Sequence, residues 1–322
     1  MTETPRWDLA AAESAVASLD LAREVGAAVG VPAVVLDPSP TDPDDRWNAV
    51  LGRLAPLAVV TVAEWGRADV IGPVDELVAA IIARPQASTT TAVHLRTLPG
   101  EPIAALHQES LAYAALQGGA EHAAWLASQG RRTRNDDAPR VALTDESDVT
   151  ITLTRSRLHN LLDRRGRDEL TDTFHSAALI APDRPIRWRA DGPSFCAGGD
   201  PAEFGAVADP ATAHLIRMAS SPGPAVLAVA DRLSVDVHGA CVGAGLELAA
   251  MASSVVAHPD TRFRLPELTM GLMPGVGGTW SIGRRIGRRL LLQWLLRDLE
   301  IDVDTALAWR LIDGVATSDE TA

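Results

Sequence analysis

Short stretches of alternating apolar and polar residues recur through the second half of the chain, and segments with helical spacing lie between them. Val149–Leu153 alternates β-branched and apolar residues, as expected of a strand with one buried face. The pattern predicts strands over 149–153, 185–189 and 234–238. It predicts helices over 164–180, over 210–232 with a Pro-Gly-Pro interruption at 222–224, and over 245–252. Repeated alternation of strand and helix predicts an α/β layered core.

The first 135 residues have a different pattern. Val31–Leu36 and Leu57–Val62 are continuous apolar runs that predict buried strands, whereas residues 74–84 and 102–129 have helical spacing. A charged, proline-containing stretch follows at 131–140 and is typical of a linker. We therefore expect two parts, 1–135 and 136–322.

Composition and charge exclude several classes of protein. The chain has 322 residues, 47% of them hydrophobic, which is enough for one large or two ordinary domains. Its net charge of −13 argues against nucleic acid or an anionic membrane as a partner. All 29 basic residues are arginine, so Schiff-base catalysis and a phosphate-binding loop lysine are excluded.

The cysteine count and the N-terminus indicate where the protein works. Cys196 and Cys241 are its two cysteines, too few for a disulfide framework, and neither they nor the histidines have metal-ligand spacing. The first residues lack a basic segment followed by an apolar run, and no stretch is long enough to span a membrane. We expect a cytoplasmic protein without a metal.

The strongest chemical signal is a pair of glutamates, Glu247 and Glu267, inside the glycine-rich segment 238–279. Glu247 lies in the first turn of a short helix that a glycine turn opens, and an upstream segment, Phe195-Cys-Ala-Gly-Gly-Asp200, forms a second glycine turn. Such turns bring backbone N–H groups close to a ligand, where they stabilise negative charge that develops on a carbonyl oxygen. Two carboxylates in one apolar pocket can divide acid and base roles.

Each glutamate alone has a simpler explanation. A glutamate in the first turn of a helix complements the helix dipole, and a Pro-Glu pair is ordinary loop composition. The combination is more specific. Both glycine turns, the twenty-residue spacing of the glutamates and the closing run Pro274-Gly-Val-Gly-Gly-Thr279 occur together over about residues 145–316.

In this order the motifs resemble those of the enoyl-CoA hydratase/isomerase (crotonase) superfamily. The resemblance implies an α/β crotonase-like fold, a repeated β-β-α core with additional helices. It further implies that the N–H groups of Gly199 and Ala244 form the oxyanion hole, that Glu247 helps to activate water, and that Glu267 exchanges the proton at the α-carbon. The family more often has glycine at the position of Ala244. No cofactor is implied, because CoA arrives as part of the substrate.

A weaker similarity concerns CoA binding. The segment from Arg155 to Leu162 resembles the place where the family holds the CoA pyrophosphate and pantetheine, so Arg155 and Arg157 could meet phosphate. The carbonyl of Ala197 is, by resemblance, a candidate to accept from the adenine amino group. Exposed loop arginines are usually only solvated, and this simpler reading stays open for each.

The resemblance leaves three questions open. The chain is expected to catalyse enoyl-CoA hydration. The alternatives are another reaction of the superfamily (isomerisation, decarboxylation or thioester hydrolysis) and a non-catalytic role as an acyl-CoA-binding subunit. Family members form trimers or dimers of trimers, so a homo-oligomer is expected. In family members, further helices follow a segment like Ala308–Gly314. Residues 74–130 of this chain resemble those C-terminal helices. They are either the same helices in a permuted order or an unrelated N-terminal helical region.

Overall fold

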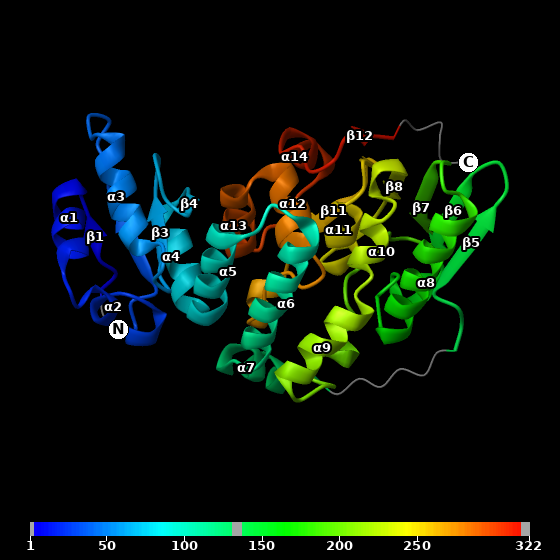
Figure 1. Ribbon diagram of the computed structural model, residues 1–322, viewed down its shortest axis with the longest axis horizontal. Helices are drawn as coiled ribbons and strands as arrows, with labels where there is room; N and C mark the ends of the chain where they lie inside the picture. The colour runs from blue at the N-terminus through cyan, green and yellow to red at the C-terminus, as the bar shows by residue number, and fades with distance from the viewer. Residues whose placement is uncertain (1–2, 131–136, 317–322) are drawn as a thin grey trace.

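The computed structural model describes residues 3–130 and 137–316, which form an elongated body with a small sheet at one end and a large sheet at the other (Figure 1). The large sheet has six strands in the order β12-β10-β8-β7-β6-β5. Its strands are β5 (Val141–Asp145), β6 (Val149–Leu153), β7 (Ile186–Ala190), β8 (Leu233–Val237), β10 (Ser254–Ala257) and β12 (Gly314–Val315). β5 and β6 pair antiparallel, and the other neighbours pair parallel. The three strands predicted from the alternating pattern are confirmed to within one residue at each end.

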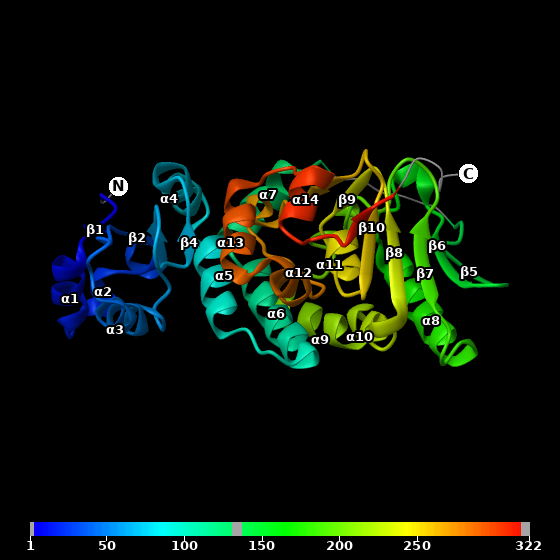
Figure 2. The same cartoon turned by 90° about the horizontal axis from the view of Figure 1, so that it is seen from above.

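Helices connect the parallel strands, as parallel pairing requires. They are α8 (Arg164–Ile180), α9 (Pro210–Ser220), α10 (Gly223–Leu227), α11 (Ala244–Ala249), α12 (Gly278–Ile286), α13 (Arg288–Arg297) and α14 (Val303–Ala308), with 3₁₀ turns η2 (Ser156–Leu158), η3 (Pro201–Glu203), η4 (Ala230–Arg232) and η5 (Glu267–Met270). Figure 2 shows α8 and α10 alongside the large sheet. The helix predicted over 164–180 is confirmed, and it begins where Asp163 accepts a hydrogen bond from the Gly166 N–H at 2.7 Å.

A third, two-stranded sheet lies beside the large one and carries the motif segments. It pairs β9 (Ala240–Val242) with β11 (Arg262–Arg264) in parallel, and an isolated bridge between Cys196 and Cys241 joins the first glycine turn to β9. This sheet therefore brings together segments that lie 45 residues apart in sequence.

The small sheet at the N-terminal end has four parallel strands in the order β1-β2-β3-β4. This part comprises β1 (Arg6–Trp7), α1 (Leu9–Ala17), α2 (Leu21–Glu24), η1 (Ala27–Val29), β2 (Ala33–Leu36), α3 (Asp44–Leu54), β3 (Val60–Ala63) and β4 (Val70–Ile71). Every residue of β2 and β3 is buried, which confirms the two strands predicted from apolar runs.

Four helices follow the small sheet: α4 (Val74–Ala83), α5 (Pro85–Thr97), α6 (Pro102–Gln117) and α7 (Ala120–Ser128). The single helix predicted over 102–129 is wrong, because it divides into α6 and α7 at Gly118-Gly119. Gly118 closes α6 with its N–H bonded to the Ala114 carbonyl, and Gly119 is extended with ψ 155° as it precedes α7.

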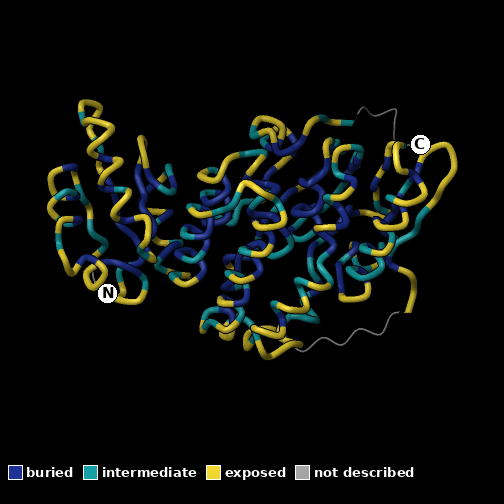
Figure 3. The backbone as a smooth tube through the Cα atoms, in the orientation of Figure 1, coloured by how far each residue is buried: buried dark blue, intermediate teal, exposed yellow. Residues whose placement is uncertain are grey.

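The larger of two apolar clusters runs through both parts of the chain, and the second lies between the small sheet and α1, α2 and α3. Buried residues of the small sheet and of α4 to α6, such as Val62, Leu77 and Leu106, belong to the same cluster as Met251 and Leu292. α6 packs on α9 and α12, α4 and α5 pack on α13, and α7 packs on η5. The buried segments of Figure 3 continue through this middle region. The parts expected at 1–135 and 136–322 thus share a core, while residues 131–136 of the predicted linker lie outside the described residues.

No helix within 3–130 or 137–316 is long and apolar enough to cross a membrane. In the same ranges, no group of three or more His, Cys, Asp or Glu residues could hold a metal ion.

Candidate active site

The two glycine turns predicted to form the oxyanion hole lie against each other. The Val242 N–H donates to the carbonyl of Cys196 at 2.9 Å, which ties the second turn to the first. Gly198 has φ 96°, and a Cβ there would lie 3.3 Å from the Val242 carbonyl oxygen and 4.0 Å from the Ala244 nitrogen. A glycine therefore permits both the backbone conformation and the close approach of the two turns.

The N–H groups of Gly199 and Ala244 belong to these turns. Ala244 is the first residue of α11, where an N–H group has no partner inside the helix. Within the described parts of the chain, neither N–H has a hydrogen-bond acceptor, and both residues are partly exposed. Two unpaired donors on adjacent turns can bind one carbonyl oxygen.

Glu267 lies directly over the second turn. Gly243, the residue before α11, has φ 48° and ψ −124°, and a Cβ there would come within 2.7 Å of Glu267 Oε1. Glu267 itself begins η5, immediately after β11. The fold thus places the Glu267 carboxyl beside the start of the helix that carries Glu247.

The carboxylate of Glu247 rests on the turn before α12. Its Oε2 accepts hydrogen bonds from the N–H of Val276 at 2.8 Å and of Gly278 at 2.9 Å. The side chain is only 2% exposed. Burial raises the pKa of Glu247 to about 7, and the hydrogen bonds from this turn oppose the rise. At neutral pH a large fraction of the carboxyl is therefore ionised and can accept a proton.

Glu267 has a different environment. It is 9% exposed, and its Oε2 is buried with no hydrogen-bond partner among the described residues. Burial, and next the negative charge of Glu247, raise the pKa of Glu267 well above its usual range. A buried carboxyl oxygen without a partner is costly, which favours the protonated form and leaves an atom that a ligand can satisfy.

Helices α6 and α7 supply further contacts. Glu109 of α6 accepts from the N–H groups of Gly277 at 2.5 Å and Thr279 at 2.8 Å, next to the amides that hold Glu247. His122 of α7 donates from Nδ1 to the Met270 carbonyl in η5 at 2.9 Å. Both turns that position the glutamates are therefore held by helices from the first part of the chain.

Three buried carboxyl groups make stability depend on pH. Burial raises the pKa of Glu109 to about 8, with repulsion from Glu247 as the second cause; the pKa values of Glu247 and Glu267 are also raised. The folded protein then holds more protons than the unfolded chain, so stability falls as pH rises. Burial lowers the pKa of His94 to about 4. The contribution of His94 to the free energy of unfolding therefore grows as pH rises from about 4 to about 6.5.

We therefore expect the free energy of unfolding to fall between pH 6.5 and 8, where the contribution of His94 has levelled off. Each carboxyl can contribute a slope of up to about 1.4 kcal/mol per pH unit. Urea denaturation across this window measures the slope, and Glu109→Gln reduces it. A flat or rising profile would show that these carboxyls do not carry raised pKa values.

The three residues predicted to bind CoA differ in their exposure. Arg155 is buried, and its guanidinium makes ion pairs at 3.1 Å with Asp163 and Asp200. Two acidic residues therefore compensate its charge inside the protein. Arg157 is exposed, and Ala197 is partly exposed with its N–H bonded to the carbonyl of His159.

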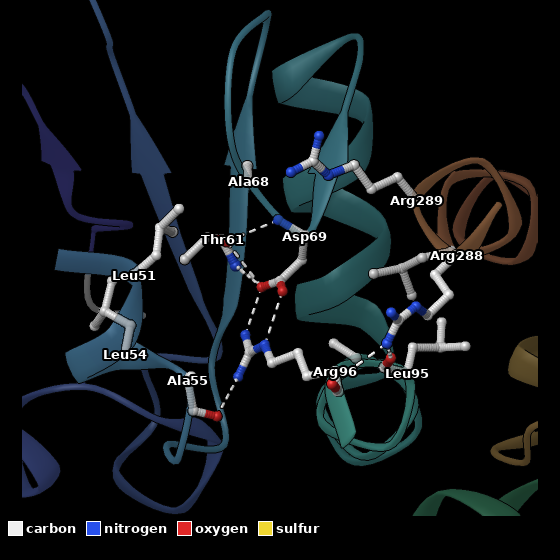
Figure 4. Close-up of a pocket in the computed structure, with 12 residues that line it drawn as sticks. Leu51, Leu54, Ala55, Thr61, Ala68, Asp69, Leu95, Arg96, Arg288 and Arg289 are labelled. Carbon is white, nitrogen blue, oxygen red and sulfur yellow. Dashed lines mark hydrogen bonds and ion pairs between the residues drawn. The ribbon is translucent and has the colours of Figure 1, made fainter. Parts of the chain in front are cut away.

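A pocket of about 320 Å³ lies apart from these glutamates, between the small sheet and helices α5 and α13 (Figure 4). It is lined by Leu51, Leu54, Ala55, Thr61, Ala68, Asp69, Ala92, Leu95, Arg96, Arg288, Arg289 and Leu292. Figure 4 shows Asp69 and Arg96 facing each other; they form a bidentate ion pair inside the pocket. This pair joins the small sheet to α5.

Comparison with known proteins places the fold and motifs in a family. Residues 144–322 match the model of the enoyl-CoA hydratase/isomerase family, and the chain belongs to that family. The crotonase-like α/β fold predicted from the motifs is thereby confirmed. The enoyl-CoA hydratase subunit I of Geobacillus kaustophilus HTA426 has 25% identity and a TM-score of 0.53, covering 57% of this chain and 71% of that one. A family member from Thermobifida fusca YX in complex with CoA has 25% identity and a TM-score of 0.50, covering 56% and 73%.

Curated relatives match shorter segments. The 2,3-dehydroadipyl-CoA hydratase of Escherichia coli K12 is 41% identical over 85 residues, which are 26% of this chain and 33% of that protein. A Mycobacterium tuberculosis H37Rv protein named "Probable enoyl-CoA hydratase EchA14" is 35% identical over 139 residues, 41% of this chain and 51% of that protein. The chain spans about half the length of these relatives or less.

Proposed function

We propose that the protein hydrates a trans-2-enoyl-CoA to a 3-hydroxyacyl-CoA. The observation that carries the proposal is that two buried glutamates lie beside two adjacent turns with unpaired N–H groups: Glu267 lies against the second turn, and Glu247 lies in the first turn of the helix that this turn opens. The names of the relatives support the same class of reaction, and the CoA bound to the Thermobifida fusca protein supports a CoA ester as substrate.

The proposed reaction uses each group once. The thioester carbonyl oxygen accepts hydrogen bonds from the N–H groups of Gly199 and Ala244, which stabilise the enolate. The ionised carboxylate of Glu247 takes a proton from water as the water oxygen bonds to C3. The protonated carboxyl of Glu267 then gives its proton to C2. The net change is addition of one water, and proton exchange restores both carboxyls.

The pKa order of the two glutamates supports this division of roles. Glu247 is held by backbone donors, which favour the ionised form that a base requires. Glu267 lacks such donors at Oε2 and lies near another negative charge, which favours the protonated form that an acid requires. Hydration thus begins with both groups in the required state.

For the CoA moiety we propose Arg157 and the carbonyl of Ala197 as contacts. Arg157 is exposed on the loop next to the first glycine turn, so its guanidinium can reach a phosphate without losing an internal partner. Arg155 takes the role of fixing that loop through Asp163 and Asp200. No metal or redox cofactor enters the proposed reaction.

We also propose that residues 74–130 replace the C-terminal helices of the family in a permuted order, ahead of a catalytic core that begins near residue 136. Contacts of α6 and α7 with the glutamate-bearing turns support this idea. A cytoplasmic homo-oligomer, a trimer or hexamer, remains our expectation. The exposed apolar side chains Leu111 on α6 and Leu215 on α9 support an interface on these two packed helices.

The proposed function is tested with a panel of short-chain, long-chain and aromatic trans-2-enoyl-CoA substrates. We expect loss of the conjugated enoyl absorbance, and the substrate with the highest kcat/KM identifies the acyl class. Absorbance that instead grows with a 3-enoyl-CoA would indicate isomerisation. Release of free CoA would indicate thioester hydrolysis, and binding without turnover would indicate a non-catalytic subunit.

A further inference from the structure

Four consecutive backbone amides, from residue 276 to residue 279, are divided between two buried carboxylates. The N–H groups of Val276 and Gly278 donate to Glu247, whereas those of Gly277 and Thr279 donate to Glu109. The two glutamates come from α11 and α6, far apart in sequence. Since the carboxylates hold alternate amides of one turn, a shift of either carboxylate requires the turn to move.

Glu109 is itself fixed by its surroundings. The Thr279 hydroxyl donates to Glu109 Oε2, and His94 of α5 lies 2.9 Å from that hydroxyl through Nε2. Because Thr279 donates to the carboxylate, its oxygen is free to accept from a His94 Nε2–H. All three side chains are at least 97% buried. The network leaves Glu109 little freedom to leave the turn.

The turn also opens α12, and this explains why it holds two acidic side chains. The first N–H groups of a helix lack partners within the helix, and the helix dipole favours negative charge there. A Cβ at Gly278 would lie 2.5 Å from Glu247 Cγ, so the turn and Glu247 are in close contact. Any displacement of residues 276–279 therefore displaces the Glu247 carboxylate.

We propose that Glu109 is a positioning residue for the acyl-CoA reaction: it anchors the 275–279 turn on which the Glu247 carboxylate rests. The assignment rests on the proposed function. It makes the first part of the chain necessary for catalysis, although Glu109 touches neither of the glycine turns. A carboxyl group suits this position because each of its two oxygens accepts from an amide N–H, whereas a glutamine would direct an NH₂ group at one of these donors.

The test compares Glu109→Gln with Glu121→Gln. Glu121 is a matched control, since its carboxyl also accepts from two backbone N–H groups, those of Gln86 and Ala87 at the start of α5, and is not hydrogen-bonded to the described residues 276–279. For Glu109→Gln we expect kcat to fall about 10²-fold with KM nearly unchanged, because a misplaced catalytic group slows the chemical step more than binding. Glu121→Gln should keep the wild-type kcat.

Hydrogen exchange, followed by mass spectrometry on peptides covering 275–279, gives a readout that needs no turnover. Glu109→Gln should lose protection there, and Glu121→Gln should not. If the wild type hydrates no enoyl-CoA, the proposed function fails while this exchange result still decides the anchoring. Unchanged kcat together with unchanged protection would overturn the proposal.

If the Glu109→Gln protein does not fold, Thr279→Val provides a second test of the anchoring role. It removes the hydroxyl contact with Glu109 and keeps the backbone N–H of residue 279. We expect a smaller loss of kcat in the same direction, again with KM nearly constant. A folded Thr279→Val protein with wild-type kcat and wild-type exchange over 275–279 would contradict the anchoring role.

Discussion

Glu267→Gln is expected to lower kcat for enoyl-CoA hydration about 10²- to 10⁴-fold, the range over which a positioned acid or base usually acts. Glutamine keeps the size of the side chain but cannot give a proton to C2. KM should change little, because the CoA moiety and the thioester carbonyl keep their proposed contacts. Steady-state rates from the absorbance assay measure both constants.

Two control variants show whether the loss of kcat comes from the missing proton transfer. Glu300→Gln replaces an exposed glutamate outside the site and should keep the wild-type rate. Combining Glu267→Gln with Glu247→Gln should cost little more than the more damaging substitution alone, because each carboxyl serves its own step of the proposed reaction and the slower step limits kcat. Full additivity would mean that the two carboxyls act independently in one transition state.

Arg96→Ala is expected to reduce the free energy of unfolding by about 3–5 kcal/mol, as removal of one partner from a buried ion pair does. The Arg96 guanidinium donates to Asp69 and to the carbonyls of Ala55 and Leu57, so the substitution leaves Asp69 without its buried cation. The Asp69 side chain is 13% exposed, and the Thr61 N–H and hydroxyl still donate to it. Urea denaturation measures the change.

Arg67→Ala is the matched control for this prediction. Arg67 pairs with Asp44 at 2.8 Å, but both side chains are substantially exposed, so its loss should cost less than about 1 kcal/mol. If Arg96→Ala also costs less than 1 kcal/mol, the ion pair does not join the small sheet to α5 as described.

Local patterns were enough to predict three of the six strands of the large sheet, β6, β7 and β8. Strand β6 and helix α8 have strict spacing, and Asp163 is a helix cap that the sequence shows directly. The two glycine turns were also predictable, since their function depends on backbone geometry that glycine permits at fixed positions. The division between α6 and α7 was missed because apolar spacing continues across Gly118-Gly119.

Long-range contacts could not be predicted from local patterns. Arg155 lies in a segment that is polar in sequence, yet its side chain is buried. Its ion-pair partner Asp200 is 45 residues away, so the local pattern does not reveal the pair. Glu109 lies 168 residues before Gly277, and its carboxyl accepts a hydrogen bond from the Gly277 N–H. One local signal did exist for Glu109: it occupies the same helical face as the buried Leu106 and the partly buried Tyr113, and an acidic residue on such a face needs internal donors.

We propose that Glu247 and Glu267 add water across an enoyl thioester, and isotope incorporation into the product tests this reaction. The wild type is incubated with the preferred trans-2-enoyl-CoA in H₂¹⁸O and, separately, in D₂O, and the product is analysed by mass spectrometry. We expect one solvent oxygen at C3 and one solvent hydrogen at C2 of an intact CoA ester. Solvent oxygen in a released carboxylate, or deuterium at C2 without oxygen at C3, would contradict it.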